Sequence, residues 1–290
     1  MSSIMTNASA MVALQSLKMT NKALDVTQGR ISTGYRVAEA SDNAAYWSIA
    51  TTMRSDNKAL SAVQDSLGLG AGKIDTAYTA MSNIIDQVDE IKSKVLSARG
   101  ASGENQKKIQ SEIAVLQEHI RSAAIGASYA GTNILATDST ADLEIVAGYN
   151  RASNGTVSVS SITISNTNIR LFSADGLTGT TITTDIMAID VDGATDATID
   201  GFLTDVEAAM SAMANAAAEL GAAKTRLDLQ TDFISNLMDS IERGVGQLVD
   251  ADMNEESTRL QALQVQQQLG IQALSIANQN AQSILSLFQG

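Results

Sequence analysis

The sequence predicts a mainly α-helical protein, in which the N-terminal and C-terminal halves form a long antiparallel coiled coil or helical bundle with a small β-rich insert. Three observations lead to this fold class. The 290 residues include no proline, the residue that most strongly breaks helices. Apolar residues recur at alternating spacings of three and four in both halves of the chain. Between the halves, residues 137–201 are instead rich in Thr, Ser, Asp and Gly.

The N-terminal segment is expected to form a helix with one moderately apolar stripe. Its polar stripe positions are Asn7, Asn21 and Gln28. Polar side chains in a coiled-coil seam lower its stability and fix the register of the partner helix. We therefore expect this helix to be marginal until it packs against other helices. The apolar stripe positions are Ala10, Leu14, Leu17, Leu24 and Ile31.

The next segment predicts one very long helix. Ser41 or Asp42 is the expected N-cap, and Gly100 and Gly103 mark the end. Spacings of three and four alternate over more than six heptads, with only Asp56 and Gly70 as seam positions that are not typical apolar residues, and this pattern is typical of a coiled-coil seam. The apolar seam positions are Ile49, Met53, Leu60, Val63, Leu67, Ile74, Ala77, Met81, Ile84, Val88, Ile91 and Val95, and a shorter helix follows with Ile109, Ile113, Leu116 and Ile120 on one face.

The insert predicts short strands with at least one hairpin. Residues 156–165 alternate between apolar and polar side chains, and residues 181–191 do so less regularly. Asn154-Gly155, just upstream of the first of these segments, is a typical hairpin turn sequence. The insert holds nine acidic residues and two arginines, so its net charge of -7 is over half of the -13 carried by the whole chain.

After the insert the helical repeat returns. Two long helices joined by a short insert are expected to pack antiparallel, with the shorter helix completing the bundle. Only Lys224 and Thr231 interrupt the apolar seam. Its other positions are Leu203, Val206, Met210, Met213, Ala217, Leu220, Leu227, Ile234, Met238, Ile241, Val245 and Leu248.

The C-terminal segment predicts a helix that needs several neighbours. No charged residue occurs from position 260 to position 290. Apolar residues also lie off the seam, including Val265, Leu269, Ile271 and Ile276. A helix that is apolar on several faces is buried on several sides, which we expect to happen in an assembly of many copies. The seam positions are Leu260, Leu263, Gln267, Gly270, Leu274, Ala277, Ala281, Ile284 and Phe288.

Residue types that carry chemistry are scarce. There is no cysteine and only one histidine, His119, so a metal centre of several Cys or His ligands is excluded. The glycine-rich segment 68–73 lacks the G-K-[ST] ending of a phosphate loop, and a weak calcium loop near Gly193 would lack ligands at both of its ends. We therefore expect no catalytic site, no cofactor and no metal.

The charge and the hydropathy of the chain also limit its partners. A net charge of -13 disfavours nucleic acid. No uncharged apolar stretch approaches the length that spans a membrane, so membrane insertion is not expected. The first 25 residues lack the basic and apolar regions of a secretory signal peptide, which leaves the cytosol or an export route that does not read such signals.

Both ends of the chain resemble bacterial flagellin. The N-terminal resemblance lies in residues 30–37 (RISTGYRV) and 40–45 (ASDNAA), and the C-terminal one in residues 274–287 (LSIANQNAQSILSL). The segment 46–57 (YWSIATTMRSDN) is most similar to flagellins of alphaproteobacteria such as rhizobia. Together the resemblance covers residues 1–136 and 202–290.

The resemblance implies a subunit that polymerises into the flagellar filament. Residues 1–43 and 252–290 would form its inner tube, residues 44–136 and 202–251 a surrounding shell of helices, and residues 137–201 the outer insert, with most of 143–164 as a hairpin. The implied location is extracellular, after type III export in an unfolded state without a cleaved signal peptide. The implied partners are further copies, alone or with other flagellins, the cap and hook-junction proteins, an export chaperone and the export gate.

Two readings of the function remain open at this point. The chain is a filament subunit, or it is a hook–filament junction protein or another coiled-coil component of the export and assembly apparatus. An enzyme built on this scaffold is disfavoured, because the insert is too short for an active-site domain and lacks convergent acid and base groups.

Overall fold

A computed structural model describes residues 7–174, 176, 179–180 and 182–289, and it describes the side chains of these residues apart from Thr184 and 280–289. The chain divides into two compact units. The first consists of Met1–Ser55 and Ser240–Gly290, and the second of Asp56–Asp239. Two long helices, α2 (Ala44–Ala98) and α6 (Asp196–Val249), contribute to both units.

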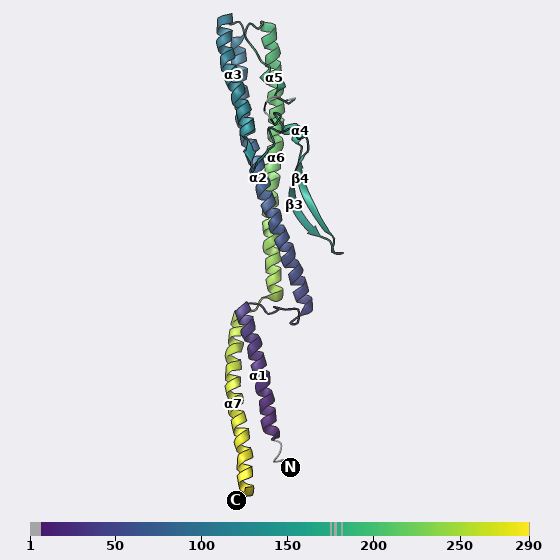
Figure 1. Ribbon diagram of the computed structural model, residues 1–290, viewed down its shortest axis with the longest axis vertical. Helices are drawn as coiled ribbons and strands as arrows, with labels where there is room; N and C mark the ends of the chain where they lie inside the picture. Colours follow the sequence, from purple (N-terminus) through teal and green to yellow (C-terminus); the bar gives the residue numbers. More distant parts are fainter. Residues whose placement is uncertain (1–6, 175, 177–178, 181, 290) are drawn as a thin grey trace. The chain divides into compact units, whose positions relative to one another are not determined.

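The first unit contains the two terminal helices, α1 (Ala8–Thr33) and α7 (Met253–Gln289), which lie side by side and antiparallel (Figure 1). Asn7 caps α1, because its side-chain oxygen accepts a hydrogen bond of 3.0 Å from the backbone N–H of Ala10. Gly34 ends α1 with a φ of 76°, which favours glycine. Asp252 caps α7 by accepting a hydrogen bond of 2.9 Å from the backbone N–H of Asn254.

The long helix α2 begins one or two residues later than the sequence predicts. The side chain of Asn43 accepts hydrogen bonds from the backbone N–H groups of Ala45 and Tyr46, so Asn43 is the cap, and the prediction of Ser41 or Asp42 was wrong. Asp42 has another role, because its carboxylate accepts hydrogen bonds from the backbone of Ala38 and Glu39 in the preceding loop. A short acidic side chain stabilises a turn in this way as readily as it caps a helix.

The core of the second unit is an antiparallel seam between α2 and α6, against which α3 (Gly103–Gly126) also packs (Figure 1). The buried positions of α2 follow the predicted alternation of three and four, from Leu60 to Ala98. Ion pairs mark the antiparallel register. Lys92 pairs with Glu207 and, seven residues on, Arg99 pairs with Asp200, which lies seven residues before Glu207. The predicted fold class, a mainly α-helical antiparallel bundle with a small β-rich insert, is confirmed.

Most predicted seam residues are buried or half-buried, but the α6 seam is displaced by one residue at alternate positions. Ala209, Ala216 and Ala223 face the core, where the sequence suggested Met210, Ala217 and Lys224. Alanine lets the helices approach closely, whereas Lys224 remains at the surface and pairs with Asp75. The buried seam residues are Leu60, Val63, Leu67, Ile74, Met81, Val88, Ile113, Met213, Leu220, Leu227 and Ile234, and the half-buried ones are Met53, Ile109, Leu116, Met210 and Ile241.

Ile49 departs further from the predicted seam. Its side chain is 49% exposed, whereas the neighbouring Ala50 is buried with Val37, Val245 and Val249. The smaller alanine again occupies the contact between helices, and the larger residue points outward. Alternation of three and four allows either neighbour to face the partner, so the sequence pattern alone does not distinguish them.

The insert contains the predicted hairpin. Strands β3 (Leu143–Arg151) and β4 (Val157–Ile164) pair antiparallel, with a bulge between Val146 and Gly148. The turn between them includes Gly155, whose φ of 84° favours glycine. A smaller antiparallel pair, β1 (Ser128–Tyr129) and β2 (Thr132–Asn133), precedes it.

The second predicted strand, at residues 181–191, is wrong, although Thr181 itself lies outside the described residues. Short helices α4 (Asn166–Ile169) and α5 (Thr184–Met187) occur in this part of the insert. The amide of Gln117, on α3, donates hydrogen bonds to the carbonyls of Ile186 and Ile189. Side chains of α3 thus satisfy the backbone groups that a neighbouring strand would otherwise satisfy.

The glycine-rich part of α2 is a docking point for the insert. Residues 68–73 lie within the continuous helix, so they form no phosphate loop. A Cβ atom on Gly70 would lie 2.6 Å from Cγ2 of Ile145, and one on Gly72 would lie 2.5 Å from the ring of Tyr129. From α6, the amide of Gln230 donates a hydrogen bond of 2.7 Å to the carbonyl oxygen of Ala147. The hairpin therefore packs against both long helices.

A matched pair of substitutions tests this docking. Gly68→Ala should raise the free energy of unfolding by about 0.5–1 kcal/mol, because nothing lies within 4 Å of the added methyl group and alanine favours the helix. Gly70→Ala should lower it by about 1–3 kcal/mol, because the methyl group displaces the buried, β-branched Ile145. Urea unfolding of both variants measures the difference. An equal gain in stability for the two variants would contradict close packing at Gly70.

Lysine–carboxylate pairs connect the helices of the bundle at its surface. Hydrogen bonds from Lys92 to Glu207, from Lys94 to Glu112 and from Lys224 to Asp75 raise the pKa of each lysine above its ordinary value of 10.5. A group whose pKa is raised by folding stabilises the fold below its unfolded pKa. That contribution is lost as the pH rises through the folded pKa.

The bundle should therefore lose stability at alkaline pH partly through these lysines. We expect the Tm of the wild-type protein to fall between pH 9 and pH 12, and the fall to be smaller in the triple variant Lys92→Gln, Lys94→Gln, Lys224→Gln. Differential scanning fluorimetry across this range measures both. Identical falls in the two proteins would show that these pairs contribute nothing to the pH dependence.

Candidate assembly surface

The α1–α7 pair is held at one end by a compact cluster. The backbone N–H groups of Arg36 and Val37 donate to the carbonyl of Val249, and the N–H of Ala251 donates to the carbonyl of Gly34. Beneath these bonds, a small core is formed by Val37, Ala50, Val245 and Val249 with Met53, Ile241 and Leu248 packed against it. We call this the closed end of the pair.

A buried ion pair adjoins the closed end. Glu256 is only 4% exposed, and its Oε1 accepts hydrogen bonds of 3.0 Å from Arg30 and 3.3 Å from Arg259. A buried carboxylate is costly unless it is paired, so this contact favours one register of α7 against α1. The sequence pattern did not predict this contact. The available signal was that Glu256 lies on the seam of α7, four residues before Leu260.

Packing becomes looser toward the other, free end. Leu24, Thr27 and Glu256 are buried, but every described residue of 7–23 and 260–279 is half-buried or exposed. Two polar contacts join the helices here. Asn7 donates a hydrogen bond of 2.9 Å to the carbonyl of Ala277, and Gln267 donates one of 2.8 Å to the side chain of Asn21. The free end is thus paired by small and polar residues and has little core of its own.

The predicted inner-tube residues are distributed unevenly over this pair. Leu17, Leu24, Ile31, Leu260, Leu263 and Leu274 are buried or half-buried, and Leu17 packs against Gly270. Leu14 is 43% exposed, and its neighbour Ala13 is half-buried in its place. Ile284 and Phe288 lie outside the residues whose side chains are described.

Two further apolar stripes on the helices are exposed to solvent. On α1, Val12, Met19 and Val26 are seven residues apart and are 67%, 62% and 45% exposed. On α7, Val265, Leu269 and Ile276 are 55%, 56% and 58% exposed, and their spacing places them along one side of the helix. Contiguous exposed apolar side chains of this kind mark interaction surfaces.

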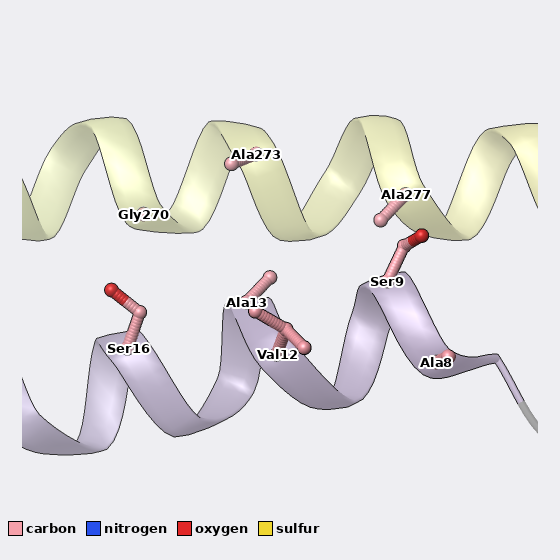
Figure 2. A pocket seen from close by; sticks show the side chains of 8 residues that line it. All are labelled: Ala8, Ser9, Val12, Ala13, Ser16, Gly270, Ala273 and Ala277. Carbon is pink, nitrogen blue, oxygen red and sulfur yellow. The ribbon is translucent and has the colours of Figure 1, made fainter.

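A shallow groove of about 550 Å³ lies between the free ends of the two helices (Figure 2). Small side chains predominate in it, and Ser9, Ala13 and Ser16 of α1 project into the space beside α7. It has no charged lining residue. Its lining consists of Ala8, Ser9, Val12, Ala13, Ser16, Gly270, Ala273 and Ala277.

The described residues offer no alternative site with recognisable chemistry. Among them, no group of three or more His, Asp or Glu side chains is placed to hold a metal ion. His119 is exposed on α3. Within the described ranges, no helix combines the length and apolar character needed to cross a membrane. The exposed stripes and the groove of the terminal pair are therefore the strongest candidate for a functional surface.

Comparison with known proteins points to one family at both ends of the chain. The bacterial flagellin N-terminal helical region matches residues 4–140, and the bacterial flagellin C-terminal helical region matches residues 203–288. The chain is similar to a flagellin of Brucella melitensis, with 55% identity over 100% of both chains. It is also similar to Flagellin C of Rhizobium meliloti, with 48% identity over 100% of both chains.

A solved structure also has a similar fold. It is a Vibrio parahaemolyticus protein described as flagellar hook-associated, with a TM-score of 0.55 and 14% identity. The similarity covers 72% of the present chain and 100% of the Vibrio chain. At this identity the similarity concerns the fold alone.

The loose free end can be tested with an engineered disulfide, since the chain has no cysteine of its own. A Cβ atom on Gly270 would lie 3.9 Å from Cβ of Leu17, within the range of about 3.5–4.5 Å found in disulfides. The oxidised double variant Leu17→Cys, Gly270→Cys should protect the amides of residues 10–23 from hydrogen exchange at least tenfold more than its reduced form. The reason is that the crosslink replaces packing that the free end lacks.

The matched control is Leu14→Cys, Gly270→Cys, in which the first cysteine is on the exposed side of α1. This control should form its disulfide much more slowly. Equal rates in the two double variants, or no gain in protection on oxidation, would contradict the pairing of Leu17 with Gly270.

Proposed function

The chain belongs to the bacterial flagellin family, and from this premise we propose how its parts are arranged in the filament, how it leaves the cell and what drives its polymerisation. Its function is that of a structural subunit that self-polymerises into the bacterial flagellar filament. The alternative of a hook–filament junction protein is not favoured, because the closely related full-length relatives are flagellins.

The terminal helices, residues 1–43 and 252–290, form the inner tube of the filament. The observation that carries this proposal is the apolar surface that the α1–α7 pair leaves exposed, namely the stripe through Met19 on α1 and the stripe through Leu269 on α7. A single pair leaves both stripes in water, whereas a tube of many pairs buries them. The residues that pack the tube are Leu14, Leu17, Leu24, Ile31, Leu260, Leu263, Leu274, Ile284 and Phe288.

The remaining helical segments, residues 44–136 and 202–251, form the shell around the tube, and residues 137–201 face outward. Support for the shell comes from the continuous apolar seam between α2 and α6, which holds the subunit rigid without neighbours. Support for the outward position of the insert comes from its net charge of -7, because an acidic surface is best hydrated and like charges separate best at the largest radius.

Polymerisation couples the ordering of the ends to the burial of their apolar stripes. The free end of the α1–α7 pair has little core, so it is only weakly ordered in a single subunit. Addition to a filament tip buries side chains such as Val12 and Ile276. Full burial of one such side chain contributes about 1.5–3 kcal/mol, which offsets the entropy lost when the helices become ordered. Nucleation without a template is costly for the same reason.

The proposed route of the subunit to the filament tip is the one that membership of the flagellin family implies. The subunit passes through the flagellar type III export gate in an unfolded state, without a cleaved signal peptide, after delivery by an export chaperone. It adds beneath the cap protein and, at the base, contacts the hook-junction proteins. The absence of proline and cysteine supports this route, because neither prolyl isomerisation nor mispaired disulfides can delay refolding outside the cell. The subunit acts without a cofactor and catalyses no reaction.

Deletion of residues 274–290 tests the role of the terminal pair. The truncated chain should remain soluble and should keep the helical bundle of residues 56–239, because that unit has its own core. It should fail to elongate filament fragments used as seeds, since α7 then lacks Ile276 and the remainder of its free end. Electron microscopy and circular dichroism measure the two properties.

The full-length chain, handled in parallel with the same seeds, is the control and should give micrometre filaments. Elongation by the truncated chain at the rate of the control would contradict the proposal. Short self-limited assemblies from the full-length chain would favour the junction alternative instead.

A further inference from the structure

The groove at the free end of the α1–α7 pair is unfilled by its own chain. Apart from Val12, each helix presents only small residues to it over about two turns, from Ser9 to Ser16 on α1 and from Gly270 to Ala277 on α7 (Figure 2). Where both walls carry Ala, Ser and Gly, the helices leave space that larger side chains normally fill. The groove therefore has room for apolar side chains supplied from outside the chain.

The exposed stripe on α7 has matching dimensions. Leu269 and Ile276 are seven residues apart, about 10.5 Å along the helix, and Val265 lies one turn before Leu269. The α7 wall of the groove, from Gly270 to Ala277, also spans seven residues. Large side chains at this spacing fit between small ones in the manner of ridges packing into grooves.

Charge selects this stripe over the one on α1. Both the groove and the α7 stripe lie in segments without charge, residues 7–17 and 260–289. The α1 stripe is instead flanked by Lys18, Lys22 and Asp25, which would lose hydration in a dry contact between helices. The surface that can enter the groove without burying a charge is the α7 stripe.

We propose that the groove on one subunit receives the Val265–Leu269–Ile276 stripe of a second copy of the chain. The inference rests on the proposed inner-tube position of the terminal helices and names the contact that joins them. The groove and the stripe are different surfaces of one chain, so each subunit can offer both at once. A contact between unlike surfaces does not close on itself as a symmetric dimer does, and it propagates into an open helical assembly.

Single-cysteine variants test the contact, because the chain contains no other thiol. Ser9→Cys and Ser16→Cys place a thiol in the groove with little change of shape. Leu269→Cys places one on the stripe. Filaments seeded from equimolar mixtures of one groove variant and the stripe variant are checked by electron microscopy, oxidised with diamide and separated on a denaturing gel without reductant.

The matched control is Ile271→Cys, which lies two residues away on the same uncharged helix and is 54% exposed, against 56% for Leu269. Its position on the helix places it off the stripe. We expect at least one groove variant to form dimers with Leu269→Cys at least tenfold faster than with Ile271→Cys. Exclusion of Leu269→Cys copies from filaments that accept Ile271→Cys copies would support the contact as well.

Equal or faster crosslinking of Ile271→Cys would overturn the proposal, as would filaments in which neither groove variant crosslinks to Leu269→Cys. If normal filaments form in either case, the proposed function of the chain as a filament subunit still holds. Failure of the unmodified chain to elongate seeds would instead overturn the proposed inner-tube function, and this inference with it.

Discussion

The structure of the subunit depends on the apolar seam between α2 and α6. Because this seam repeats every seven residues over most of two long helices, it forms a continuous apolar core without help from other subunits. The other elements of each unit pack against these two helices. The hairpin packs over the glycines of α2, α3 covers the seam near one end, and the closed end of the α1–α7 pair is stabilised by Val245 and Val249 from the last turns of α6. The free end of the α1–α7 pair has no comparable core of its own.

The sequence predicted the helices and the hairpin well because both follow from short-range periodicity. The sequence pattern failed where either of two neighbouring residues could face the partner helix. Ile49 and Met210 are larger than Ala50 and Ala209, yet the alanines face the partner helix, because close approach of two helices favours the smaller side chain. The strand predicted near residue 186 failed for another reason. Its backbone groups bond to Gln117, a side chain distant in sequence that no local pattern reveals.

The candidate assembly surface follows from the sequence in outline but not in detail. The uncharged C-terminal segment indicates burial against several neighbours, and the stripe through Leu269 is visible in the spacing alone. The groove cannot be recognised from the spacing, because it is formed by small residues on two segments that are about 260 positions apart in the chain. The buried Glu256 was hidden for a similar reason. The burial of the Glu256 carboxylate depends on its ion pair with Arg30. The position of Arg30 opposite Glu256 follows only from the register of the folded α1–α7 pair.

The three glycines at positions 68, 70 and 72 have a mechanical consequence. Each interior glycine weakens a helix by roughly 0.5–1 kcal/mol relative to alanine, so this turn and a half is the most compliant section of α2. The hairpin packs against Gly70 and accepts a hydrogen bond from Gln230, so it supports that section of α2 from outside. The stability of α2 at these turns therefore depends on the hairpin as well as on the seam itself.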